Sequence, residues 1–265
     1  RHSVRAQAAR GATMARPETA SFLVGLQLTN GQPALGAIGQ QDLASSDSQA
    51  TDGLSERTLY NPLGSVTVLS GGRIFVADYL NNRILGYPAI PTSSNAPADL
   101  VLGQPDFTTS TSGTSQGTFR GPVQMAVGGG RMAVVDITNS RVLIWSAIPT
   151  ASGTLPDVVI GQANFTSLAR SCSATGMDTP QSVFITPDGK MLVADTTNHR
   201  VLVWLAVPTV SGTPPDLVLG QSDFTHCFYN DADQNGVAEM PTARTLWRPT
   251  GLWSDGKRLV VLDSS

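Results

Sequence analysis

The sequence has few of the residues on which catalysis and metal binding usually depend. Its 265 residues include only two cysteines and three histidines. It has no nucleophile elbow, phosphate loop, HExxH motif or CxxC motif, which removes the common signals for a hydrolase, a nucleotide-binding protein and a zinc site. With only His2, His199 and His226 present, we do not expect a catalytic histidine cluster.

Charge and long apolar runs are also scarce. Charged residues make up 14% of the chain, and the net charge is −3. This balance gives no electrostatic reason to expect nucleic acid or an anionic membrane as a partner. No apolar run approaches the roughly 20 residues of a membrane-spanning helix. We therefore expect neither a nucleic-acid partner nor a membrane span.

The sequence is instead rich in turn-forming residues, with 26 Gly and 17 Pro, and it repeats itself. The stretch VADTTNHRVLVWLAVPTVSGTPPDLVLGQ begins at Val193, and related stretches begin at Val76 and Val134. The first Asp of each copy, taken as position zero, is Asp78, Asp136 or Asp195, so the copies are 136 − 78 = 58 and 195 − 136 = 59 residues apart. A fixed period near this length is typical of a solenoid or a propeller.

Seven further positions keep the same spacing from the Asp in all three copies. They are Asn at +3 (Asn81, Asn139, Asn198), Arg at +5 (Arg83, Arg141, Arg200), an aromatic residue at +9 (Tyr87, Trp145, Trp204), Pro at +13 (Pro91, Pro149, Pro208), Asp at +21 (Asp99, Asp157, Asp216), Gly-Gln from +25 (Gly103, Gly161, Gly220) and Phe at +29 (Phe107, Phe165, Phe224). Partial copies flank these three, and Asp263 falls on the Asp position of the last one.

Each copy reads as four short strands that are separated by turns. The first strand follows a Pro, the second ends at the repeat Asp, the third begins at the repeat Arg, and the fourth precedes Gly-Gln. Because no segment has sustained helical periodicity, we predict an all-β fold, a β-propeller of four-stranded antiparallel blades. The predicted parts are a disordered N-terminal segment at 1–21, a half-blade at 22–43 with strands at 22–28 and 34–40, blades at 62–107, 122–165 and 180–224, and a half-blade at 249–265.

The motif D-x-x-N-x-R-V-L-x-W, preceded by a P-x-x-V strand, resembles the NHL-repeat family of β-propellers, in the long-repeat variant that ends in L-G-Q-x-D-F. The resemblance covers about residues 22–265 and implies a propeller, usually of six blades, without implying one function. About four blades' worth is visible. It is either a segment of a larger ring, which we favour, or a four-bladed ring closed by the N- and C-terminal half-blades.

In a four-stranded meander, the turn between the second and third strands and the link to the next blade lie at the same end. This end forms a loop-rich face, where we expect a ligand to bind, with Arg83, Arg141, His199 and Arg200 on it. The repeated Asp and Arg residues could form a ring of catalytic pairs, but a structural role is favoured because every copy carries the pair. An Asp that ends a strand accepts backbone N–H bonds in the turn, and an Arg five residues later can pair with the carboxylate bidentately. The Asp and Asn of each copy are expected to stabilise this turn. These structural turn residues are Asp78, Asp136, Asp195, Asn81, Asn139 and Asn198.

One unrepeated stretch suggests a calcium site. Asp231, Asp233 and Asn235 alternate before Gly236, which resembles the first half of a calcium loop, and Glu239 follows. Thr242 stands at position twelve in place of Glu, and an ordinary acidic turn is the alternative. The four candidate ligands are Asp231, Asp233, Asn235 and Glu239. For Cys172 and Cys227, a disulfide and two free thiols both fit the sequence.

Two functions compete. The first is a noncatalytic scaffold, extracellular, periplasmic or on the cell surface, that binds a protein, peptide or glycan through the loop-rich face. The second, implied by resemblance to lyase- or lactonase-like propellers, is an enzyme with a metal in the central channel and part of its site outside this segment. The expected inner strands carry no His, Asp or Glu, so we favour the scaffold. RNA binding, known for some family members, is disfavoured by the acidic balance.

Overall fold

The computed structural model describes residues 30, 32–45 and 53–264. The chain divides into two compact units, Arg1–Leu35 and Gly36–Ser265, and every described strand lies in the second. The N-terminal segment predicted at 1–21 and the strand predicted at 22–28 lie outside the described residues. No helix in the described part of the chain is long and apolar enough to cross a membrane.

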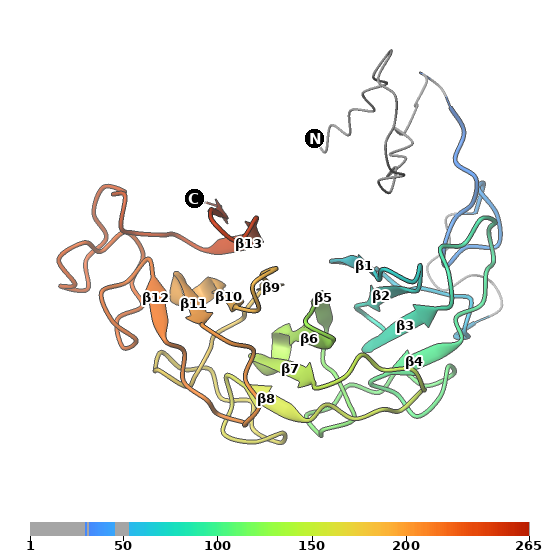
Figure 1. Cartoon of the computed structure of the whole chain (residues 1–265), viewed down its shortest axis with the longest axis horizontal. Helices are drawn as coiled ribbons and strands as arrows, with labels where there is room; N and C mark the ends of the chain where they lie inside the picture. The colour runs from blue at the N-terminus through green and yellow to red at the C-terminus, as the bar shows by residue number, and fades with distance from the viewer. Residues whose placement is uncertain (1–29, 31, 46–52, 265) are drawn as a thin grey trace, which may run out of the picture. The chain divides into compact units, whose positions relative to one another are not determined.

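The second unit contains three four-stranded antiparallel sheets and one two-stranded sheet, and strands that follow one another in sequence pair with one another (Figure 1). Blade 1 consists of β1 (Val66–Val68), β2 (Ile74–Asp78), β3 (Arg83–Tyr87) and β4 (Leu100–Leu102). Blade 2 consists of β5 (Pro122–Gly128), β6 (Arg131–Asp136), β7 (Arg141–Trp145) and β8 (Val158–Ile160). Blade 3 consists of β9 (Ser182–Ile185), β10 (Met191–Asp195), β11 (Arg200–Trp204) and β12 (Leu217–Leu219), and the C-terminal half-blade of β13 (Pro249–Ser254) and β14 (Leu259–Asp263).

The middle strands of each blade are buried on both faces. All residues of β2, β3, β7, β10 and β11 are buried, and β6 is exposed only in part at its first residue. A strand with both faces covered reads as a continuous apolar run instead of an alternating one, as IFVAD and RVLIW do. The sheets must therefore be packed face to face on each other.

Side chains from neighbouring blades share the same hydrophobic clusters. Trp145 of blade 2 packs with Leu100 and Leu102 of blade 1. Trp204 of blade 3 lies in one cluster with Val158 and Ile160 of blade 2. The first strands of consecutive blades are also in contact, in the order β1, β5, β9 and β13. Repeated meanders packed in this way, with their first strands together, are the blades of a β-propeller, as the sequence predicts.

Residues 34–40 form no strand, although the sequence predicts one there. The segment still makes a contact typical of a fourth strand, because the Ala37 N–H donates to Ser94 Oγ at 3.0 Å, as the Val101 N–H does to Ser152 Oγ. A strand requires a hydrogen-bonded neighbour along its length, and the described residues supply none for this segment. The prediction of a strand at 34–40 is therefore wrong for the described part of the chain.

The turn between the second and third strands has a left-handed residue before the repeat Arg. Single 3₁₀ turns, η1 (Ile137–Asn139) and η2 (Thr196–Asn198), join β6 to β7 and β10 to β11. The residues after them, Ser140 and His199, have φ of 51° and 55°, and Asn82 in blade 1 has φ of 51°. These turns lie at the same end of each blade as the links between blades, and their side chains build the site.

Candidate functional site

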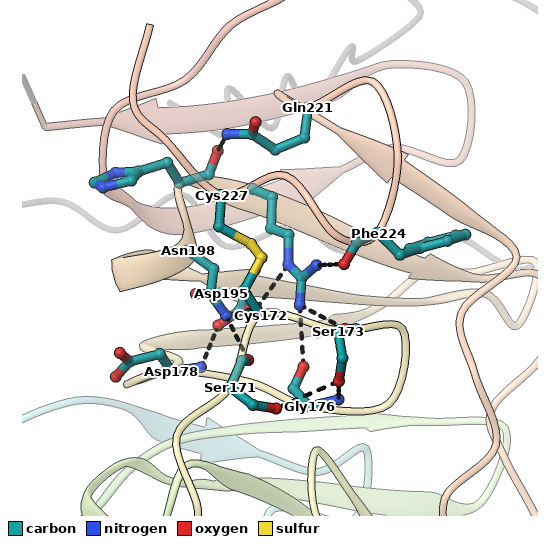
Figure 2. Close-up of polar contacts among 12 residues, drawn as sticks. Ser171, Cys172, Ser173, Gly176, Asp178, Asp195, Asn198, Gln221, Phe224 and Cys227 are labelled. Carbon is teal, nitrogen blue, oxygen red and sulfur yellow. Dashed lines mark hydrogen bonds and ion pairs between the residues drawn. A yellow bond between two sulfur atoms is a disulfide. The ribbon is translucent and has the colours of Figure 1, made fainter. Parts of the chain in front are cut away.

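The repeat Asp of blade 3 accepts hydrogen bonds from three directions (Figure 2). Asp195 Oδ2 accepts from Arg200 Nε and from Asn198 Nδ2, both at 2.8 Å, and its Oδ1 accepts the Asp178 N–H at 2.8 Å. The side chains of Asp195 and Arg200 are 0% exposed. The carboxylate therefore holds together the turn, the third strand and the residue that leads into the first strand.

Arg200 uses its other nitrogens to bind two separate links, whose accepting residues Phe224, Ser173 and Gly176 are labelled in Figure 2. Its Nη1 donates to Phe224 O at 2.6 Å, in the link that follows blade 3. Its Nη2 donates to Ser173 O at 2.9 Å and to Gly176 O at 3.0 Å, in the link that precedes the blade. One buried guanidinium thus fixes two loops of the face to the same blade.

Blades 1 and 2 repeat this arrangement. Arg83 pairs with Asp78 and Arg141 with Asp136, both at 2.8 Å and with all four side chains 0% exposed. The Asn of each turn also donates to its Asp. The backbone carbonyls that receive the two arginines belong to Ser55, Thr58 and Phe107 for Arg83, and to Thr114, Ser115, Thr118 and Phe165 for Arg141.

This placement corrects the expectation that the arginines lie on a binding face. Arg83, Arg141 and Arg200 lie at the correct end of the blades, but each is buried, with Nε, Nη1 and Nη2 all hydrogen-bonded inside the protein. A guanidinium in this position has no exposed surface for a ligand. The three arginines therefore hold the loops of this face in place from buried positions.

Burial also changes the acidity of the three aspartates. Burial raises the pKa of Asp195 to about 6, and the positive charge of Arg200 and the hydrogen bonds only partly oppose this. Burial likewise raises the pKa of Asp78 and of Asp136. A perturbed carboxyl often marks a functional site when it faces a cleft. Here the carboxylates are enclosed and paired, so the raised pKa reflects the burial of a structural group.

His199 accepts a hydrogen bond from the next link. Its Nδ1 accepts the Arg248 N–H at 3.1 Å, so the neutral ring carries its proton on Nε2. Burial, and then the charge of Arg248, lowers the pKa of His199 and favours this neutral form. The sequence shows Asn, Ser and His in this slot as unrelated residues, whereas the structure shows that each is an acceptor. The equivalent bonds run from Gly121 N–H to Asn82 Oδ1 at 3.0 Å and from Thr179 N–H to Ser140 Oγ at 3.2 Å.

An exposed cluster of aromatic rings lies beside His199. Tyr229 stacks on Phe228 with 5.0 Å between ring centroids and on Trp247 with 4.5 Å, and both pairs are 24° from parallel. His199 contacts Tyr229 edge-on at 5.5 Å. Phe228 is 39% exposed and Trp247 is 37% exposed. We call Phe228, Tyr229 and Trp247 the aromatic stack.

The same place in the preceding link holds charged side chains. Gln221 Nε2 donates to Phe228 O as Gln162 Nε2 donates to Ala169 O, so Tyr229 corresponds to Arg170. The Trp247 N–H donates to Asp263 as the Asp178 N–H donates to Asp195, so Trp247 corresponds to Asp178. Arg170 and Asp178 form an ion pair at 3.7 Å. The two links therefore share the same backbone hydrogen bonds but have different side chains at equivalent positions. These equivalent positions are recognised only by comparing the links in space.

The candidate calcium loop is held by hydrogen bonds of its own. Asp231 accepts the Asn235 N–H at 3.0 Å and the Gly236 N–H at 2.7 Å, and Asp233 accepts the Asn235 N–H at 3.2 Å. Glu239 accepts a backbone N–H of the loop at 3.3 Å. In the described ranges, no group of three or more His, Cys, Asp or Glu side chains is placed to hold a metal ion. Calcium binding here stays a prediction from the sequence.

The two cysteines form a disulfide (Figure 2). Their Cα atoms are 6.1 Å apart, and the bond connects the link before blade 3 with the link after it across a sequence separation of 55 residues. Ser171 and Ser173 flank Cys172, and their carbonyls accept from Asn198 and Arg200. The disulfide and the buried arginine therefore hold the same two links.

A cavity of about 460 Å³ lies between the first strands. No His, Cys, Asp or Glu is among its lining residues, so the described lining offers neither the usual metal ligands nor a carboxylate or imidazole for acid–base catalysis. The lining consists of Leu63, Gly64, Ser65, Tyr79, Val123, Gln124, Ile137, Gln181 and Thr250.

Removing the repeat Asp should destabilise the protein strongly. We expect Asp195→Ala to reduce the free energy of unfolding by roughly 3–5 kcal/mol, because Arg200 would stay buried without its counter-charge. Urea unfolding followed by circular dichroism measures this loss. Asp188→Ala, which removes the exposed partner of Lys190, is the control and should leave the melting temperature close to that of the wild type. An Asp195→Ala curve that overlays the wild type would contradict the structural role.

The disulfide should stabilise the native protein. We expect Cys172→Ala to reduce the free energy of unfolding by roughly 2–4 kcal/mol, because the bond constrains the unfolded chain. The double variant Cys172→Ala/Cys227→Ala should lose no more than the single variant, since both remove one bond. Mass spectrometry after alkylation, with and without reductant, gives an independent check. Two alkylated thiols in unreduced protein from an oxidising host would show that no bond forms.

Comparisons with known proteins assign no family to the chain. No protein-family model matches the chain, and no curated protein matches it. Among solved structures, the chain is similar to a catalytically inactive virginiamycin B lyase from Staphylococcus aureus with quinupristin, with a TM-score of 0.29 and 12% sequence identity. The match covers 81% of this chain and 83% of that chain. The strand order and blade packing described above establish that the chain has an all-β, β-propeller fold.

Proposed function

We propose that this protein is a noncatalytic propeller scaffold that binds a protein, peptide or glycan partner through its loop-rich face. The aromatic stack is the observation that carries this proposal. It lies on the link between blade 3 and the half-blade, where two of its rings are more than one-third exposed. The repeated Asp and Arg residues of the same face are buried. A partner would therefore contact other side chains, which lie nearer the surface.

The geometry of the stack suits recognition of a flat or apolar surface. Tyr229 stacks on both Phe228 and Trp247, and these two outer rings are more exposed than Tyr229. Aromatic side chains supply large contact areas at little entropic cost, and Trp and Tyr are enriched among the residues that dominate binding energy. The neighbouring acidic loop adds exposed polar groups at Asp233 and Glu239. An aromatic centre with a polar rim is the usual anatomy of an interface.

The same proposal includes the protein's family and its cellular location. The D-x-x-N-x-R motif makes the same buried network in all three blades, which supports membership of an NHL-like group of propellers. The disulfide between Cys172 and Cys227 supports an oxidising location, extracellular, periplasmic or on the cell surface, because such bonds persist mainly there.

The alternative, a lyase- or lactonase-like enzyme with a metal in the central channel, has less support. Its site would require metal ligands on the first strands or near them. The described cavity between those strands is lined by aliphatic, hydroxyl and amide side chains and by Tyr79. No observation in the described residues favours this function over binding.

A panel of immobilised glycans and synthetic peptides tests the scaffold proposal. We expect at least one ligand to bind saturably and Trp247→Ala to weaken it by about tenfold or more, the loss that a central aromatic contact typically causes. Trp253→Ala, which removes another exposed Trp outside the stack, is the matched control and should bind as the wild type does. Absence of any binder, or equal binding by the two variants, would contradict the proposal.

Calorimetric titration with CaCl₂ tests whether the acidic loop at residues 231–239 binds calcium. If the loop binds calcium, we expect saturable heat that Asp233→Ala abolishes, because oxygen ligands at alternate positions are required. Asp255→Ala, at an exposed turn of the half-blade, should retain the heat. A titration without heat would show that residues 231–239 form an ordinary acidic turn.

A further inference from the structure

Arg120, in the link between blades 1 and 2, occupies the position that Asp178 and Trp247 occupy in the two later links. The Arg120 N–H donates to Asp136 at 2.7 Å, which is the bond that the N–H groups of Asp178 and Trp247 make to the repeat Asp that follows them. The Arg120 carbonyl accepts the Thr138 N–H at 3.2 Å, as the Asp178 carbonyl accepts a threonine N–H of the next turn. The three links therefore share these backbone hydrogen bonds.

Ser112 lines a cavity together with Arg120. It follows the carbonyl that the link's Gln side chain contacts, as Arg170 and Tyr229 do in the later links. Those two side chains are long and meet the equivalent of Arg120, in the ion pair and in the aromatic stack. The serine side chain ends at one hydroxyl, and a cavity of about 230 Å³ lies beside it. The link between blades 1 and 2 is therefore hollow where the later links have side chains in contact.

A glycine gives the cavity part of its wall. Gly121 has φ of 76°, but the equivalent residues Thr179 and Arg248 have φ of 51° and 57° and carry side chains, so the backbone conformation alone does not require glycine. A Cβ on Gly121 would lie 2.7 Å from a ring carbon of Tyr79 and 3.3 Å from the Thr138 hydroxyl oxygen. The missing side chain therefore leaves space for these two groups, and both line the cavity.

The groups that line the cavity suit an anion. Arg120 is exposed, and across the described ranges no Asp or Glu side chain pairs with its guanidinium. Tyr79, Ser112 and Thr138 each add a hydroxyl that bonds to no other described residue, and none of the described lining residues is acidic. The repeat Asp that accepts the Arg120 N–H is already paired with its own arginine. A guanidinium and hydroxyls are the donors that an oxyanion requires.

We propose that this cavity binds a carboxylate, supplied by an acidic side chain of a peptide or protein partner, with Arg120 as its counter-charge. In the next link, Arg170 and Asp178 form an ion pair at 3.7 Å between the equivalent positions, with the two residue types placed so that the acid stands where Arg120 does. The chain thus fills this place with an arginine and an acidic side chain in one link, and supplies only the arginine in the other. A single guanidinium matches the single charge of a carboxylate, whereas a phosphate group carries more than one charge.

A titration of the full 265-residue protein with a short peptide, followed by nuclear magnetic resonance, tests the proposal. The peptide is blocked at both ends and carries one Asp between alanine and serine residues, so its only charge is that carboxylate. We expect saturable shifts of the Arg120 and Thr138 amide signals. The peptide with Asn in place of Asp should bind at least tenfold more weakly, because it loses the hydrogen bonds to a charged group. Equal binding of the two peptides, or no saturation in the high-millimolar range, would overturn the proposal.

Protein variants locate the site. Arg120→Gln should weaken binding of the Asp peptide at least tenfold, whereas Arg244→Gln, which removes another exposed arginine and the same charge, should bind as the wild type does. Ser112→Asp should supply the carboxylate from within the chain and block the peptide, while Ser112→Asn, of similar size and without charge, should not. Because Arg120 and Ser112 are exposed, we expect all four variants to fold, which circular dichroism checks. Wild-type affinity in Arg120→Gln would contradict the site.

Two further measurements separate this proposal from its alternatives. Acetate serves as a free carboxylate, and the Asp peptide should bind several-fold more tightly than acetate because its backbone and neighbouring side chains add contacts around the cavity. Acetate that binds as tightly as the peptide would assign the site to free organic acids and overturn the peptide as the source. Trp247→Ala should bind the Asp peptide as the wild type does, because the aromatic stack lies in a different link. Failure of the stack as a binding site and failure of this cavity therefore give different results.

Discussion

The structure depends on one interaction, the buried pairing of a carboxylate with a guanidinium at the end of each second strand. Two buried charges are tolerated only when each has its counter-charge and enough hydrogen bonds. Here the Asp receives an Arg, an Asn and a backbone N–H, and the Arg reaches carbonyls in the links on both sides of its blade. One turn of six residues therefore determines where two long links lie. Repetition of the turn then organises the entire loop-rich face.

The contrast between residues that repeat and residues that vary indicates where on the protein function is expected. Residues that repeat in every blade are buried and carry the frame, whereas the side chains that the frame presents differ from link to link. The pair Arg170 and Asp178 in one link is replaced by Tyr229 and Trp247 in the next. Recognition by such a face would come from the varied positions, since identical copies cannot distinguish one partner from another. The disulfide connects the link that carries the aromatic stack with the link before blade 3.

The sequence predicted the fold because the signals for it are local. Apolar runs of four to seven residues, turn-forming residues and a fixed period are visible without coordinates, and so is the structural role of an Asp that every copy carries. Burial of the arginines was not predictable in the same way, because topology places a residue at one end of a blade without stating its depth. Their partners are backbone carbonyls of Ser, Thr, Gly and Phe, which leave no side-chain pattern to read. The aromatic stack was missed because an insertion separates Tyr229 from Trp247, and the acceptor role of His199 because Asn and Ser supply the same bond.

Hydrogen exchange measured by mass spectrometry tests the role of the arginine most directly in blade 2, whose preceding link contains no cysteine. Arg141→Lys keeps the charge beside Asp136 but cannot bond to carbonyls on both sides of the blade. We expect faster exchange in residues 113–118 and 163–167, with protection in β6 and β7 retained. Exchange that stays unchanged in both links would show that the arginine does not hold them, and would contradict the central claim.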